Sequence, residues 1–232
     1  MKEKRTVKRS GEFGKNPSPQ LIDAIEKITK DFYGEGLPTK FVSPFAMLVA
    51  TVISQRTRDE TTVEVASRLL EIAPDPLSLL DLPEEDLIRI LRPAGFYRQK
   101  AKKLKEIARI LLEKYGGRVP DEEAELLSLP GVGRKTASVV LAYAFSKPAI
   151  AVDTHVHRIF NRLGLVKTKT PERTEEALKK ILPEKLWIPL NHSFVSFGKR
   201  VCRPVSPRCE ECPLKEFCDF YRNRSKNSQE GN

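Results

Sequence analysis

The sequence LPGVGRKTA, residues 129–137, decides the fold because it lies between two segments with helical patterns. The first helix is expected over about 121–128 and ends before Pro130, which cannot continue a helix. The second is expected to begin after Gly133, because the apolar run 137–145 has the composition of a packed helix. The pattern therefore predicts a helix-hairpin-helix over about 121–145.

The hairpin itself has the composition of a phosphate-binding turn. Gly131 and Gly133 flank Val132, and this spacing permits a tight turn with positive φ and a close approach of the backbone to a ligand. The N–H groups that open the second helix carry a partial positive charge, to which Arg134 and Lys135 add. We interpret the hairpin as a phosphate-binding site that reads no sequence, with a plain helix–helix turn as the alternative.

The net charge agrees with a nucleic-acid partner. The 232 residues include 41 Lys and Arg against 31 Asp and Glu, so the formal net charge is +10. The longest mostly apolar runs, 45–53 and 137–145, are far shorter than the roughly 20 residues that span a bilayer. We expect no membrane span. The basic start has no apolar stretch behind it and predicts no secretory signal.

Helix start signals recur along the chain. Ser18-Pro19, Ser43-Pro44 and Thr170-Pro171 each combine a capping side chain with a proline at the first helical position. No stretch shows the sustained alternation of a β-strand. The predicted fold class is all-α.

A second motif is VDTHVHR, residues 152–158. Asp153 stands where an N-cap belongs, so a structural role is one interpretation of it. His155 and His157 are two residues apart and point to different sides of a helix, which makes them a poor metal pair. We interpret the two histidines as structural or DNA-facing.

The third motif contains all four cysteines, in the spacing C-x6-C-x2-C-x5-C. Such a compact group indicates one metal centre, because a disulfide framework would normally be spread through the chain. A single C-x2-C flanked by two lone cysteines favours an iron–sulfur cluster over zinc, which usually uses two close-spaced pairs. The predicted ligands are Cys202, Cys209, Cys212 and Cys218.

Together these motifs resemble the endonuclease III family of helix-hairpin-helix DNA glycosylases. The resemblance runs from about Ser43 to Cys218. It implies a bilobal all-α fold with a six-helix barrel lobe over 37–148. It also implies a second lobe, built from 17–36 and 149–221, that carries a [4Fe-4S] cluster.

The resemblance also implies catalytic roles. Lys135 would be the nucleophile, with an ordinary surface lysine as the alternative, and Asp153 its catalytic partner. An amine can displace a damaged base at C1′ and then form a Schiff base that drives β-elimination, which a hydroxyl or carboxylate cannot do. A carboxylate can stabilise a cationic sugar-like transition state and help to move protons.

Two further residues would open the duplex once the target base is flipped out. By resemblance Gln55 would fill the gap, although a polar residue at a helix C-terminus is the alternative. Phe96 would act as a second wedge, and it departs from the leucine that is common there. Arg56 and Arg58 also depart from some relatives. The predicted DNA-binding residues are Gln55, Phe96, Gly131, Val132, Gly133 and Arg134.

Lys135 and the cysteines separate branches of this superfamily. By resemblance, mismatch enzymes that act only as glycosylases lack the lysine, and 8-oxoguanine glycosylases usually lack the four cysteines. We therefore predict a bifunctional DNA glycosylase and AP lyase that removes oxidised pyrimidines, such as thymine glycol, from double-stranded DNA. The alternatives are a glycosylase for mismatched or deaminated bases and a non-catalytic DNA-binding module with a zinc knuckle.

The remaining expectations concern the chain ends and the setting. Residues 1–16 are predicted to be a mobile basic arm and 222–232 a disordered tail. The arm could touch DNA phosphates or be a solvated tail. We expect a monomer that acts in the cytoplasm, associated with the nucleoid, of a prokaryote. The 31% of charged residues and only two Met favour a thermophilic source.

Overall fold

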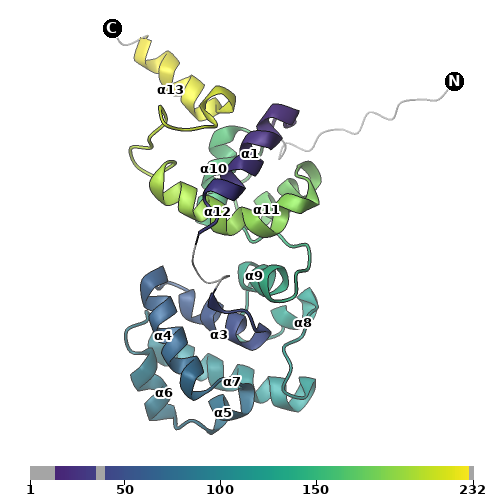
Figure 1. Ribbon diagram of the computed structural model, residues 1–232, viewed down its shortest axis with the longest axis vertical. Helices are drawn as coiled ribbons and strands as arrows, with labels where there is room; N and C mark the ends of the chain where they lie inside the picture. Colours follow the sequence, from purple (N-terminus) through teal and green to yellow (C-terminus); the bar gives the residue numbers. More distant parts are fainter. Residues whose placement is uncertain (1–13, 35–39, 230–232) are drawn as a thin grey trace, which may run out of the picture. The chain divides into compact units, whose positions relative to one another are not determined.

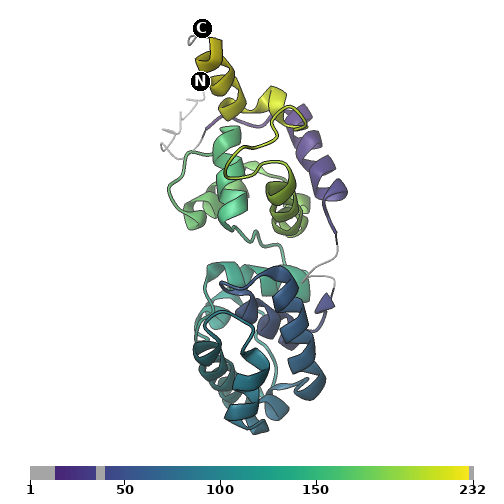
Figure 2. The ribbon, with the colours of Figure 1, turned by 90° about the vertical axis from the view of Figure 1, so that its left-hand side faces the viewer.

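The computed structural model describes residues 14–34 and 40–229, and side chains as far as residue 224. Every regular element in this part of the chain is a helix, which confirms the predicted all-α class. The chain divides into a central unit, Gly34–Ala151, and a terminal unit, Met1–Tyr33 with Val152–Asn232. Figures 1 and 2 show each unit as a helical bundle. In the described residues no helix is long and apolar enough to cross a membrane.

The central unit is built around a buried helix. Its helices are α3 (Pro44–Ser54), α4 (Asp59–Ile72), α5 (Pro76–Asp81), α6 (Glu84–Leu91), α7 (Tyr97–Tyr115), α8 (Glu123–Leu127) and α9 (Arg134–Ala144). All residues of α3 from Met47 to Ile53 are buried, because α4, α7 and α9 pack around it. The long helix α7 faces the core with one stripe and ends at Gly116, whose φ of +59° is the left-handed conformation of a helix stop.

The terminal unit packs aromatic side chains. Its helices are α1 (Pro19–Asp31), α10 (Thr154–Leu163), α11 (Pro171–Ile181), η1 (Glu184–Leu186), α12 (Trp187–Arg200), η2 (Lys215–Phe217) and α13 (Asp219–Gln229). Phe194 of α12 lies with its ring centroid 5.0 Å from Phe160 of α10 and 5.8 Å from Phe197. On α1, the backbone oxygen of Thr29 accepts a hydrogen bond of 2.9 Å from Ser193. These contacts hold α10, whose first turn carries a predicted site residue.

The predicted capping residues begin their helices. Ser18 accepts a hydrogen bond from the N–H of Leu21, and Ser43 accepts one from Ala46. Thr170 caps α11 in the same way, and a proline follows each cap. The side-chain oxygens therefore satisfy backbone donors that a helix leaves unpaired at its start.

The two chain ends differ from expectation where they are described. Residues 1–13 of the predicted arm lie outside the described residues, but Gly14 and Lys15 donate backbone hydrogen bonds to the Leu165 and Gly164 carbonyls. The tail predicted to be disordered continues α13 as far as Gln229. The helix is anchored at its start, because Asp219 accepts a hydrogen bond from the Lys15 ammonium and Phe220 packs under an arginine.

Candidate functional site

The hairpin between α8 and α9 forms as predicted, but its two glycines have different conformations. Gly131 has a φ of +78°, in the region that favours glycine, and the Val132 N–H closes the turn on the Leu129 carbonyl at 3.1 Å. Gly133 has a φ of −96° and is the N-cap of α9, so only Gly131 of the two uses the positive φ that glycine permits. A Cβ on Gly133 would have no neighbour within 4 Å, so this residue leaves open space at the helix N-terminus.

Lys135 lies in the first turn of α9, close to the hairpin. The residue is half-buried, and the preceding Arg134 is exposed. The next residue, Thr136, is buried against the rest of the unit, which fixes the start of the helix. The predicted nucleophile therefore stands at the positive end of a helix dipole, beside backbone N–H groups that can donate hydrogen bonds to an anion.

The structure brings Gln55 to this hairpin, across a sequence distance of 76 residues. Gln55 directly follows α3, and its side-chain Nε2 donates a 2.8 Å hydrogen bond to the Gly131 carbonyl. The same nitrogen lies 3.4 Å from the hydroxyl oxygen of Thr136. Gln55 is therefore a part of the hairpin surface.

A neighbouring loop carries Phe96. Its side chain is 54% exposed, which is unusual for a phenylalanine, and its φ is +57°. Arg56 also has a positive φ, +54°, and its guanidinium carbon lies 5.4 Å from the centre of the Phe96 ring. This distance is typical of a cation–π contact. Two strained residues that hold an apolar ring at the surface are characteristic of a functional segment.

Sequence reasoning did not identify Lys100 and Thr57, which support these two loops. The Lys100 ammonium is buried and donates 2.7 Å hydrogen bonds to the Ile53 carbonyl and to the Thr57 hydroxyl. Burial, aided by the charge of Lys103, lowers the pKa of Lys100 to about 8. The sequence does carry a signal for the burial of Lys100, because this residue shares one face of α7 with the buried Leu104.

Asp153 belongs to the terminal unit and caps α10. Its Oδ1 accepts 2.9 Å hydrogen bonds from the N–H groups of both His155 and Val156. A carboxylate has two oxygens and about four acceptor positions, so capping leaves acceptor capacity for chemistry. The cap fixes the orientation of the carboxylate.

The two histidines of this motif make structural contacts. His157 Nδ1 lies 2.6 Å from the Thr174 hydroxyl oxygen, and burial lowers the pKa of the imidazole. His155 Nδ1 lies 3.2 Å from a guanidinium nitrogen of Arg158. These contacts favour the structural interpretation of both residues.

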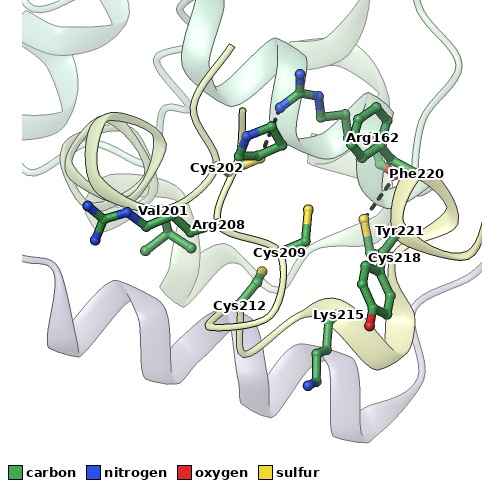
Figure 3. A pocket seen from close by; sticks show the side chains of 11 residues that line it. Arg162, Val201, Cys202, Arg208, Cys209, Cys212, Lys215, Cys218, Phe220 and Tyr221 are labelled. Carbon is green, nitrogen blue, oxygen red and sulfur yellow. Dashed lines mark hydrogen bonds between the residues drawn. The ribbon is translucent and has the colours of Figure 1, made fainter. Parts of the chain in front are cut away.

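The four cysteines surround one hollow near the C-terminus of the described chain (Figure 3). All four are half-buried free thiols, and no disulfide joins them. Burial raises the pKa of Cys212 to about 11 and raises that of Cys218 as well, so the thiolates need a cation to compensate their charge.

The arrangement of the donors indicates which kind of centre they fit. Among the described residues, no three His, Cys, Asp or Glu side chains are close enough together to hold a single metal ion. Figure 3 shows the four sulfur atoms around the hollow. Four thiols around one hollow are a donor set that fits a multi-iron cluster with one thiolate on each iron.

Two arginines of α10 hold the cysteine loop. Arg162 donates to the carbonyls of Arg203 and Pro204, both at 2.7 Å, and stacks on Phe220 at 4.5 Å from the ring centre. One of its nitrogens lies 3.6 Å from the Cys202 sulfur. Arg158 donates a 2.8 Å hydrogen bond to the Cys202 carbonyl. The helix that begins at Asp153 thus also shapes the metal site.

Metal analysis tests this assignment. Protein purified without oxygen is expected to contain iron and acid-labile sulfide and to absorb visible light, and Cys212→Ser should lose iron. A colourless protein with one zinc and no iron would contradict the cluster.

Substitution of the hairpin glycines separates folding from binding. Gly131→Ala should lower the free energy of unfolding by about 1–2 kcal/mol, because alanine is strained at positive φ. Gly133→Ala should leave unfolding within about 0.5 kcal/mol of wild type, since its Cβ meets no neighbour. Gly133→Ala should nevertheless weaken binding to abasic-site DNA, because the methyl group occupies the space open to a phosphate. Unchanged affinity in this folded variant would count against the hairpin as a phosphate site.

Comparison with protein families agrees with both parts of the site. Residues 49–184 match the model for the HhH-GPD superfamily base excision DNA repair protein. Residues 202–218, which begin and end at a cysteine, match the iron–sulfur binding domain of endonuclease III. This second match confirms the iron–sulfur cofactor expected from the sequence.

Individual relatives cover most of the chain. Endonuclease III of Thermotoga maritima is 60% identical over 187 residues, which are 81% of this chain and 88% of the relative. Endonuclease III of Bacillus subtilis is 40% identical and covers 89% of this chain and 95% of its own length. A solved structure titled as a trapped endonuclease III–DNA covalent intermediate, an estranged-adenine complex, superposes with a TM-score of 0.80 at 36% identity. The superposition covers 89% of this chain and 97% of the chain in that structure. The chain therefore belongs to the endonuclease III family of HhH-GPD base excision DNA repair proteins.

Proposed function

We propose that this DNA glycosylase and AP lyase removes oxidised pyrimidines, such as thymine glycol, from double-stranded DNA and then cleaves the abasic site. The observation that carries the proposal is the amine of Lys135, placed in the first turn of α9 beside an open hairpin. The hairpin supplies backbone donors for DNA phosphates, and Gly131, Val132, Gly133 and Arg134 form this contact.

Lys135 acts as the nucleophile. Its Nζ lone pair forms a bond to C1′ while the bond from C1′ to the base breaks, and the base leaves with that electron pair and a proton. Opening of the sugar ring gives an iminium between Nζ and C1′. Removal of a proton from C2′ then expels the 3′ phosphate by β-elimination.

Asp153 serves as the catalytic carboxylate. Its cap hydrogen bonds occupy Oδ1 and hold the side chain in one orientation. The carboxylate stabilises positive charge on the sugar during base loss and helps to move protons. Its two interpretations, as a cap and as a catalytic group, are compatible.

Gln55 and Phe96 open the duplex. Gln55 takes the space that the flipped nucleotide leaves, and Phe96 enters the stack as a wedge. Support comes from the placement of Gln55 at the hairpin and from the exposure of the Phe96 ring. Cys202, Cys209, Cys212 and Cys218 would hold a [4Fe-4S] cluster. The cluster would shape the cysteine loop and would take no part in breaking bonds.

We propose a monomer that acts at the nucleoid in the cytoplasm of a prokaryote. Bacterial relatives that cover most of the chain support the prokaryotic source. The match to the Thermotoga protein is consistent with the thermophilic source expected from composition.

Borohydride trapping on an abasic-site duplex tests the central step. The wild type should form a covalent adduct, since reduction of the iminium fixes the amine to the sugar. Lys135→Ala should form none, whereas the control Lys114→Ala, an exposed lysine at the far end of α7, should react like wild type. No adduct from a cluster-loaded, folded wild type would exclude the lyase mechanism.

A panel of damaged duplexes tests the substrate class. Release of thymine glycol should greatly exceed release of thymine from a G·T mismatch. A thermostable thymine-DNA glycosylase superposes with a TM-score of 0.79, but at 24% identity this likeness shows the fold alone. Strong release of mismatched thymine without action on thymine glycol would favour the mismatch alternative.

A further inference from the structure

Two separate segments of the central unit meet at one hydroxyl group. The Thr57 oxygen accepts a 2.7 Å hydrogen bond from the Lys100 ammonium and a 3.3 Å bond from the Gly95 N–H. The same hydroxyl donates to the Gln55 carbonyl at 3.4 Å. It therefore links the segment that presents Gln55 to the one that presents Phe96.

The Lys100 ammonium is unusual for a lysine. Lys100 is only 4% exposed, although a buried charge is costly unless it is well paired. Besides Thr57, it donates to the Ile53 carbonyl at 2.7 Å. This carbonyl lies in the last turn of α3, where helix carbonyls have no partner within the helix and the dipole is negative. Lys100 thus fixes the end of α3 from which Gln55 emerges.

The backbones of the two segments also touch. A Cβ on Gly95 would lie 2.6 Å from the Arg56 carbonyl oxygen, so only glycine allows this approach. Arg56 and Phe96 both have positive φ and stack on each other at 5.4 Å. Strain on both sides of the junction indicates that their relative position is fixed by the contacts behind them.

We propose that Lys100 and Thr57 are positioning residues that preassemble Gln55 and Phe96 into a single strand-opening element. The proposal rests on the roles proposed for Gln55 and Phe96. Lys100 and Thr57 act through the two segments and touch no reacting atom. A preassembled element enters the duplex without first losing loop entropy, so the target nucleotide, with or without its base, is extruded at a lower barrier.

A second lysine of the same helix provides a matched control. Lys105 donates a 2.7 Å hydrogen bond to the Leu80 carbonyl and another to the Leu82 carbonyl, at the end of α5. Lys105 thus binds carbonyls at the end of α5, as Lys100 binds a carbonyl at the end of α3. No segment with a proposed strand-opening role follows α5. Lys105→Met therefore reports the effect of losing such a cap on folding alone.

The first experiment compares cleavage of an abasic site in duplex and in single-stranded DNA. Lys100→Met and Thr57→Val should reduce duplex cleavage by about tenfold, the typical effect of losing a hydrogen bond to a charged group. Both should leave single-strand cleavage unchanged, because no strand has to be opened. Thr57→Ser keeps the hydroxyl and should restore duplex cleavage, and Lys105→Met should change neither substrate. Equal losses on both substrates would overturn the proposal.

The second experiment is a double-mutant cycle with Gln55→Ala. Because Lys100 acts partly through Gln55, the loss of duplex cleavage in Lys100→Met/Gln55→Ala should be smaller than the product of the two single losses. Losses that multiply would overturn the positioning role. A Gln55→Ala variant with wild-type activity would instead overturn the gap-filling role proposed above. Melting temperature and visible absorbance of each variant establish that it is folded and loaded with its cluster.

Discussion

The burial of α3 on all sides is the constraint on which the rest of the central unit depends. A helix that is apolar all round has to be covered by neighbours, and α4, α7 and α9 provide that cover. Because α9 packs on α3, the hairpin before α9 lies beside the end of α3. The contact between Gln55 and Gly131 follows from this packing. Two parts of the sequence that lie 76 residues apart therefore share one surface.

In the terminal unit α10 has the equivalent position. Its first turn orients the Asp153 carboxylate, and its later turns present Arg158 and Arg162 to the cysteine loop. The aromatic contacts of Phe160 hold the helix between these two ends. One rigid element thus carries both a proposed catalytic group and the support of the metal site, so distortion of the loop would reach Asp153 through a single helix.

Much of this arrangement could be predicted from local patterns. The helix starts at Ser18, Ser43 and Thr170 were visible because capping chemistry is local, and so was the cap at Asp153. The conformation of Gly133 could not be predicted, because its φ depends on the path of the whole hairpin. The helical end of the chain was also missed. Its sequence is polar, and the contacts that anchor its first turn come from residues distant in sequence.

The terminal unit is assembled from both ends of the chain, and this has a consequence for the order of folding during synthesis. The hydrogen bond between Thr29 and Ser193 joins residues 164 positions apart. A ribosome releases the whole central unit before α12 exists, so the central unit can fold first while α1 waits without its partner. The amphipathic face of α1 is exposed throughout that interval. Chaperone demand during translation should therefore concentrate on α1.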